Sequence, residues 1–189
     1  MGTESLEKAF AGTRHILANV SPEQYGDPTP CTSWTVRDLV NHIVEGANWF
    51  PLCVNAGAAP DPDPTHGFDY AGGDPLASFD EGSAAAVAAF GAPGALDRMI
   101  KLPFGELPAA VFLGIATNDV VTHGWDLAKA TGQAYEVDPE LATDLLAHMR
   151  NFADGLRGPD GVGAFGTELE VADDAPPMDR LAAYLGRQP

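Results

Sequence analysis

The clearest helical pattern of the chain is PAAVFLGIATNDVVTHGWDLAKATG, residues 108–132. Pro108 suits the first turn of a helix because the amide hydrogen that proline lacks would have no partner there. Gly132 is a natural C-terminal stop, and Lys129 would place a cation in the last turn, where the helix dipole favours it. The stretch therefore predicts a long helix, the best defined of the chain.

On both sides of this stretch, Pro and Gly residues divide the rest of the chain into further helical segments. We expect helices over about residues 4–20, 35–51, 78–90 and 139–156, and a short terminal helix within PPMDRLAAYLG, residues 176–186. Thr35 can cap the second of these, and Asp38 adds negative charge in its first turn. Asp138 and Pro139 fit the cap and first position of the fifth.

The intervening segments predict loops. Residues 55–80 are too rich in Pro, Gly and Asp for regular structure, and loops of this length are often lids or rims of sites. The stretch RMIKLPFGELP, residues 98–108, fits either a short extended piece or a turn around Gly105. Residues 157–175 are Gly- and acid-rich, which predicts a surface excursion.

The order of elements predicts an all-α fold, a helix bundle with an additional short C-terminal helix. Internal repeats and shifts of composition are absent from the sequence. We therefore expect residues 1–189 to form a single domain, with 157–189 as a C-terminal extension packed on the bundle.

Composition narrows the class of protein. The chain has 27 Asp and Glu against 10 Lys and Arg, a net charge of −17 that would repel nucleic acids and anionic membranes. We find no apolar stretch of membrane-spanning length and no signal-peptide pattern at the N-terminus, so we expect a cytoplasmic protein. Cys31 and Cys53 do not make a disulfide framework and should be small buried thiols.

Three side chains stand out as metal ligands. Asp119 and His123 are four residues apart, so they lie on one helical face and can converge on one point. His42, within the second predicted helix, would supply a third ligand if that helix faces the fourth. Two histidines and one carboxylate leave a coordination position open, as in catalytic zinc sites.

Other residues have lesser roles in this interpretation. Glu45 and Asp126, each one turn after a histidine, could fix the imidazole tautomers, with Asn118 as a less favourable alternative. Trp34, Trp49 and Trp125 fit either a pocket or the core. A further alternative stays open, because a histidine on an apolar helical face is often a hydrogen-bonded core residue.

Two segments, PTPCTSWTVRDLVNHIVEGANWF and DVVTHGWDLAKATGQ, resemble the signature stretches of the actinobacterial DinB-like proteins related to mycothiol-dependent maleylpyruvate isomerase. The resemblance implies a DinB-like four-helix bundle with zinc, or alternatively nickel, near one end. It implies the ligands His42, Asp119 and His123. In the isomerase the acidic ligand is Glu, one methylene longer than Asp119. The isomerase also has a C-terminal domain at its substrate site, for which this chain has little room.

The resemblance implies two hypotheses of different class. One is a metal-dependent transferase or isomerase that uses mycothiol, or another low-molecular-weight thiol, on a small electrophilic substrate. Arg37 could then bind a carboxylate, although it could equally face solvent. The other is a non-catalytic metal-binding bundle that serves as a structural or ligand-binding module. Under either hypothesis a homodimer is open, and neither a nucleic acid nor a membrane is expected as partner.

Overall fold

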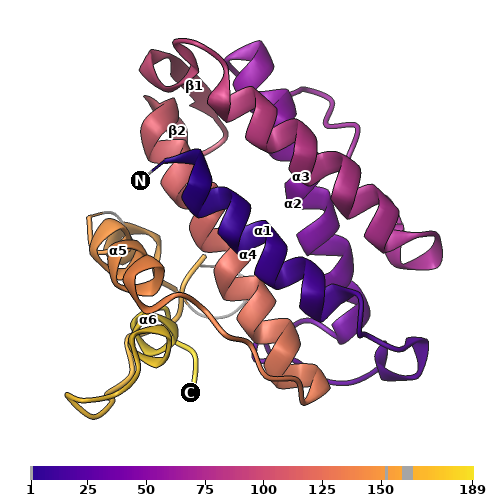
Figure 1. The fold of residues 1–189 in the computed structure, drawn as a ribbon, viewed down its shortest axis with the longest axis vertical. Helices are drawn as coiled ribbons and strands as arrows, with labels where there is room; N and C mark the ends of the chain where they lie inside the picture. The colour runs from indigo at the N-terminus through magenta and orange to yellow at the C-terminus, as the bar shows by residue number, and fades with distance from the viewer. Residues whose placement is uncertain (1, 152, 159–163) are drawn as a thin grey trace.

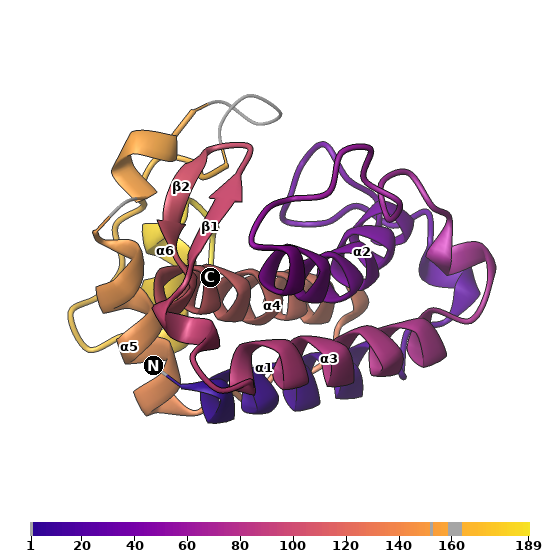
Figure 2. The ribbon, with the colours of Figure 1, turned by 90° about the horizontal axis from the view of Figure 1, so that it is seen from above.

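Four long helices form a bundle in which each helix packs against two others. They are α1 (Thr3–Leu17), α2 (Val36–Ala56), α3 (Pro75–Gly91) and α4 (Ala109–Thr131). In this computed structural model, which describes residues 2–151, 153–158 and 164–189, α2 packs on α3 and α4, and α1 packs on α3 and α4. Figure 1 shows the bundle, and Figure 2 shows α1 and α3 as one layer with α2 and α4 as the other. The expected all-α, DinB-like bundle is confirmed.

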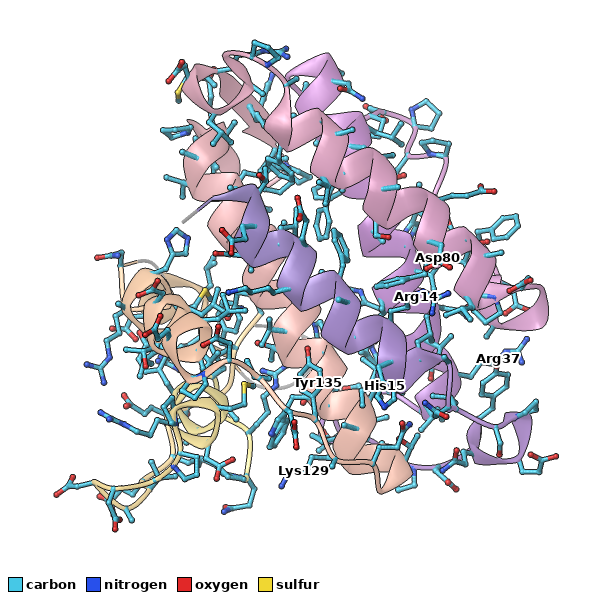
Figure 3. All side chains as sticks on the ribbon, viewed as in Figure 1. Arg14, His15, Arg37, Asp80, Lys129 and Tyr135 are labelled. Carbon is cyan, nitrogen blue, oxygen red and sulfur yellow. The ribbon has the colours of Figure 1, made fainter. Side chains whose placement is uncertain are left out.

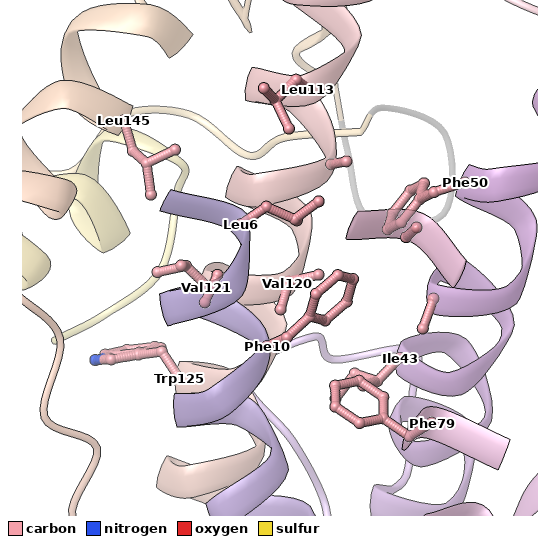
Figure 4. Packing of buried hydrophobic residues seen from close by; sticks show 14 of the residues in the cluster. Leu6, Phe10, Ile43, Phe50, Phe79, Leu113, Val120, Val121, Trp125 and Leu145 are labelled. Atoms are coloured by element: carbon pink, nitrogen blue, oxygen red, sulfur yellow. The ribbon is translucent and has the colours of Figure 1, made fainter. Parts of the chain in front are cut away.

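The core fills the space between these two layers. Phe10 of α1 meets Phe79 of α3 edge to face, with ring centroids 5.6 Å apart. Figure 4 shows buried side chains of the hydrophobic cluster from all four helices, with Leu145 of the next helix along the chain to one side: Leu6, Phe10, Ile43, Phe50, Phe79, Leu113, Val120, Val121, Trp125 and Leu145. Burial of this apolar surface is the main force that holds the helices together.

An ion pair on the surface links α1 to α3. Arg14 donates from Nε and Nη2 to the two carboxylate oxygens of Asp80, at 2.6 and 2.7 Å (Figure 3). Because both side chains are nearly half exposed, solvent screens the pair, and it contributes little beside the core.

The start of α2 is built as its sequence predicts. Thr35 and Asp38 form a capping box, in which the Thr35 amide donates to Asp38 Oδ2 at 2.9 Å. The amides of Val36 and Arg37 donate to carbonyl oxygens of Asp27 and Tyr25 in the preceding loop. The amides of Thr35, Val36 and Arg37 therefore all have hydrogen-bond partners outside the regular helical pattern, and these bonds fix the residue at which α2 begins.

Four helix bounds differ from the sequence prediction. α1 ends at Leu17 instead of about residue 20, and α3 begins at Pro75 instead of about residue 78, where Asp74 caps it. α2 does not end at Pro51 but continues to Ala56, where Gly57 adopts a left-handed conformation with φ 72°. Proline removes one helical hydrogen bond, but Cys53 and Val54 beyond it are buried, and their burial favours continuing the helix. α5 (Pro139–Met149) is shorter than expected, and a 3₁₀ turn, Ala153–Leu156, follows it.

The stretch around Gly105 is a hairpin, which settles the alternative left open by the sequence. β1 (Met99–Leu102) pairs antiparallel with β2 (Gly105–Pro108). Lys101 also joins the hairpin to the end of α2, since its amide donates to the Gly57 carbonyl at 3.0 Å and its carbonyl accepts from the Ala59 amide at 2.8 Å. The hairpin stands at the end of the bundle where α4 begins (Figure 2).

The C-terminal elements pack on the α4 side of the bundle. α5 packs on α4, and α6 (Pro177–Tyr184) packs on α5 (Figure 1). Gly114 of α4 permits this contact, because a Cβ there would lie 2.3 Å from Nε2 of His148. None of the helices within the described residues is long and apolar enough to cross a membrane.

The long loop between α2 and α3 lies along α2 (Figure 2). Asn41 accepts the amide of Ala71 at 2.8 Å, and Arg37 pairs with Asp69. A short 3₁₀ helix, Tyr70–Gly72, forms within the loop. The loop is thus held by polar side chains of the first half of α2, the half that carries His42.

Candidate metal centre

The three predicted ligands converge between α2 and α4. Asp119 Oδ1 lies 3.4 Å from Nε2 of His42 and 3.6 Å from Nε2 of His123. One ligand atom from each of the three residues lies within 4.8 Å of the other two. The imidazole centroids are 4.6 Å apart and the ring planes are at 79° to one another.

A glycine in α2 leaves room for the carboxylate. A Cβ on Gly46 would lie 3.4 Å from Asp119 Oδ2 and 3.3 Å from the ring of Phe50. Gly46 is one turn after His42 on the same helix, so the two helices can approach while Asp119 stays between them. The sequence offered this glycine no special role.

The electrostatics of the three groups are coupled. Burial alone would raise the pKa of Asp119, but the imidazoles of His42 and His123 hold it below its ordinary value. For His42, burial acts to lower the pKa, yet the Asp119 carboxylate raises it overall. Burial and then the neighbouring His42 lower the pKa of His123. The carboxylate is therefore ionised at neutral pH, and His123 is the more readily neutral of the two imidazoles.

A tryptophan covers both imidazole rings. The Trp34 centroid is 4.7 Å from that of His42 and 5.5 Å from that of His123. The loop before α2 holds it there, because the buried Thr29 hydroxyl lies within hydrogen-bond distance of the carbonyls of Cys31 and Trp34, at 2.9 and 3.0 Å. The sequence allowed Trp34 either in a pocket or in the core. In the structure its ring lies beside two of the candidate ligands, His42 and His123.

The far nitrogen of His123 has a carboxylate partner, as its spacing predicted. His123 Nδ1 lies 3.0 Å from Asp126 Oδ2. Since Asp126 is ionised, Nδ1–H donates to it, which leaves the lone pair on Nε2 facing Asp119 and His42. Burial alone would raise the pKa of Asp126, but His123 and Arg187 lower it to about 2.

A second group of donors, Cys31, His123 and Asp126, also lies within 4.8 Å. It does not fit a metal ion, because the Arg187 guanidinium already contacts Asp126 at 3.0 Å and Cys31 Sγ at 3.6 Å. Burial, followed by the Asp126 charge, raises the pKa of Cys31 to about 12, so the sulfur stays a thiol. The thiol donates to Asp126 Oδ2 at 3.3 Å. This second group contacts the candidate centre through the hydrogen bond between Asp126 and His123.

Three other residues with predicted roles at the site, Glu45, Asn118 and Arg37, have partners elsewhere. Glu45 does not have a described hydrogen bond to His42; its carboxylate lies 3.2 Å from Nδ1 of His66 in the long loop. Asn118 is buried and accepts from Thr122. Arg37, labelled in Figure 3, is exposed and pairs with Asp69.

Sequence reasoning missed Arg187, which follows α6 and reaches back to α4. It also gave Cys31 no role beyond that of a buried thiol. No signal marks Arg187 in the sequence, because arginine is usually exposed and this one is 61 positions from its partner. For Cys31 the only signal is its place in the PTPCTSW stretch just before α2.

The donor set fits a divalent cation. Zinc takes histidine nitrogen and carboxylate oxygen at about 2.0 Å in a tetrahedron, so its ligands lie roughly 3.3 Å from one another. The distances of 3.4 and 3.6 Å from Asp119 to the two histidines are close to this value. His42 and Asp119 are 34% and 28% exposed, so a small molecule can approach.

Known proteins resemble this chain over its whole length. Two uncharacterized proteins from two strains of Mycobacterium tuberculosis are each 40% identical to it over 194 residues, covering 99% of this chain and 96% of theirs. No solved structure matches it significantly. The sequence model of a family described as the mycothiol maleylpyruvate isomerase N-terminal domain matches residues 6–128, which include all four bundle helices except the ends of α1 and α4. The chain therefore belongs to the family of the mycothiol maleylpyruvate isomerase N-terminal domain.

Proposed function

We propose that this chain is a metal-dependent thiol transferase or isomerase of the cytoplasm. His42, Asp119 and His123 would hold one divalent cation, zinc or alternatively nickel. Mycothiol, or a thiol of the same kind, would be the cosubstrate, and the second substrate would be a small electrophile.

One observation carries the proposal. Two imidazole nitrogens and one carboxylate oxygen from α2 and α4 lie within 4.8 Å of one another, inside the region that matches the family. Three protein ligands are the number that catalytic zinc sites use, with a further position left for water or substrate. The family's printed description, which names mycothiol, supports a thiol as the molecule that binds there.

A divalent cation at this place would lower the pKa of a bound thiol and so supply a thiolate at neutral pH. The sulfur would form a C–S bond to one carbon of a double bond conjugated to a carbonyl, and the π electron pair would move toward the carbonyl oxygen. After rotation about the new single bond, the electron pair returns from the oxygen, the double bond re-forms and the C–S bond breaks, which gives an isomer and releases the thiolate. If the carbon next to the carbonyl takes up a proton instead, the product is a conjugate of the thiol and the substrate.

The chain's own residues have distinct tasks in this scheme. Trp34 covers the two imidazoles and excludes water from one side of them. Asp126 does not fit a proton carrier, because its pKa is about 2, with burial opposed by His123 and Arg187. Glu45 fits better, since it is one turn after His42 and its side chain is 26% exposed.

Cobalt substitution tests the proposal. Metal-free protein is titrated first with Co²⁺ and then with mycothiol, and the visible absorption is recorded. We expect one Co²⁺ per chain and a new sulfur-to-cobalt band with mycothiol. His42→Ala should weaken Co²⁺ binding by more than about a hundredfold, since even outer partners of a ligand are worth roughly 10–100-fold.

His15→Ala is the matched control, because His15 is exposed on α1 (Figure 3) and belongs to neither group of possible metal ligands among the described residues. It should bind Co²⁺ as the wild type does. Wild-type protein that binds no Co²⁺ overturns the metal centre. Protein that binds Co²⁺ but gives no spectral response to mycothiol is the non-catalytic binding module instead.

A further inference from the structure

Asp126 is a fully buried carboxylate that accepts hydrogen bonds from three side chains. Its side chain is 0% exposed. Oδ2 accepts from His123 Nδ1 at 3.0 Å, from Cys31 Sγ at 3.3 Å and from Arg187 Nη2 at 3.0 Å. Arg187 Nε lies 3.1 Å from Oδ1 and 3.2 Å from Oδ2.

A buried carboxylate requires a counter-charge, and Arg187 supplies it. Among the described residues, Arg187 is the only lysine or arginine that pairs with Asp126. A guanidinium that contacts both oxygens fixes the plane of the carboxylate as well as its charge, which a single ammonium group does not.

The backbone conformation after α6 directs the Arg187 side chain toward Asp126. Gly186 adopts a left-handed conformation with φ 86°, and a Cβ there would lie 2.6 Å from Cα of Gly166. The Arg187 amide donates to the Ala182 carbonyl at 2.9 Å, and Nη1 donates to the Leu185 carbonyl at 3.1 Å. The side chain is 10% exposed. Arg187 is therefore held in place by its own segment before it reaches Asp126.

We infer that Arg187 is a positioning residue of the metal centre, acting on His123 through Asp126. By fixing the Asp126 carboxylate it keeps the Nδ1–H of His123 engaged and the Nε2 lone pair directed at Asp119 and His42. The C-terminal segment, outside the matched residues 6–128, is thereby part of the centre. The inference rests on the proposed metal site, and the experiment separates the two.

Three variants test it: Arg187→Met, which keeps bulk without charge, Arg187→Lys, which keeps charge without the two-oxygen contact, and Arg157→Met. Arg157 is the matched control, because it ties the same C-terminal segment together, donating to the carbonyls of Gly166 and Tyr184 at 2.7 and 2.8 Å. It has no described contact with the centre. Circular dichroism establishes that each variant is folded.

Co²⁺ affinity and the visible spectrum are the first readout. We expect Arg187→Met to bind Co²⁺ roughly 10–100-fold more weakly with an altered spectrum, and Arg187→Lys to recover part of the loss. Arg157→Met should keep the wild-type affinity and spectrum. Wild-type affinity and spectrum in Arg187→Met overturn the inference, as does an equal loss in Arg157→Met. If Arg187→Met does not fold, the Arg187→Lys comparison decides.

The second readout needs no metal. The ¹⁵N shifts of the His123 ring in metal-free protein report which nitrogen carries the proton. We expect protonation at Nδ1 in the wild type and a mixture of tautomers in Arg187→Met. An unchanged tautomer in that variant overturns the inference, even if the wild type binds no Co²⁺ and the proposed function fails.

Discussion

At the scale of single residues, two aspartates on α4 have opposite environments. Asp119 is 28% exposed and faces two imidazoles, whereas Asp126 is 0% exposed and is held by a guanidinium. The spacing along one helix predicted both, because positions three and four residues from His123 share its face. Spacing assigned Glu45 a similar role beside His42, yet Glu45 contacts His66. A helical register fixes which face a side chain is on, but not which neighbour arrives from elsewhere.

Asp126 should make the stability of the metal-free protein depend on pH. Its pKa falls from an ordinary 3.8 to about 2 in the folded chain, where burial is outweighed by His123 and Arg187. A lowered pKa stabilises the fold above the unfolded value, and the stabilisation is lost as the pH falls. We expect about 2 kcal/mol of the free energy of unfolding to disappear between about pH 4 and pH 2. Urea unfolding across this range measures it.

Asp126→Asn should lack this part of the pH dependence. Asp144→Asn, at an exposed carboxylate on α5, controls for the loss of one negative charge. Identical pH profiles for wild type and Asp126→Asn would contradict the assignment of the effect to this side chain.

The contacts of Arg187 and Cys31 with Asp126 could not be predicted from the sequence. Cys31 comes from the loop before α2 and Arg187 from the turn after α6, and both reach Asp126 of α4. Such a meeting depends on how loops and a terminal helix pack, which no local pattern encodes. That Asp119 and His123 lie side by side was predictable from their helical spacing, whereas the approach of His42 depends on how α2 packs on α4, and the sequence offered it only as the obvious supplier of a third candidate ligand and through a family resemblance.

At the scale of elements, the start of α2 was easier to predict than its end. The cap at Thr35 is local chemistry and is formed as expected. The end of α2 is decided by tertiary burial, which carries the helix past Pro51 to Ala56. The same reason explains the hairpin, since the pairing of β1 with β2 and with the end of α2 is a contact that the sequence of residues 98–108 left open.

The contact between α2 and α3 depends on Gly82. A Cβ there would lie 2.9 Å from backbone atoms of Ala47 and Asn48, so the two helices would have to separate. We expect Gly82→Ala to destabilise the protein by about 1–3 kcal/mol, the usual range for overpacking, against a gain in helix propensity of at most about 1 kcal/mol. Urea unfolding gives the difference.

Gly91→Ala is the control for this substitution. At Gly91, also on α3, the nearest atom to an added Cβ is Cγ2 of Thr3 at 3.9 Å, an ordinary contact. This variant should be neutral or slightly more stable. A Gly82→Ala protein as stable as the control would contradict the close approach of α3 to α2.

At the scale of the whole molecule, negative charge is in large excess. With a net charge of −17, the acidic groups repel one another, and surface pairs such as Arg14 with Asp80 relieve only a part of this. Composition gives the excess of negative charge, but it does not indicate that one of the ten lysines and arginines is buried beside Asp126.

Monovalent salt should therefore stabilise the metal-free protein. Raising NaCl from about 0.02 to 0.5 M shortens the screening length from roughly 20 Å to about 4 Å, which weakens the repulsion. We expect an increase of about 1 kcal/mol in the free energy of unfolding, or roughly 2–4 °C in the thermal midpoint of a domain of this size. At about pH 4.5, close to the isoelectric point of about 4.3 expected from the sequence, the net charge is small and the increase should be smaller. A midpoint that falls with salt at neutral pH would contradict this account.

The distance of 61 positions between Asp126 and Arg187 also orders events during synthesis on the ribosome. At roughly 5–20 residues per second, α4 emerges several seconds before the segment that neutralises its buried carboxylate. In that interval the residues of the four bundle helices have been synthesised, but Asp126 lacks the counter-charge of Arg187. Docking of the turn that carries Arg187 therefore follows synthesis of α4, and under the proposed metal centre a nascent chain arrested before that turn should bind Co²⁺ less tightly than the full chain.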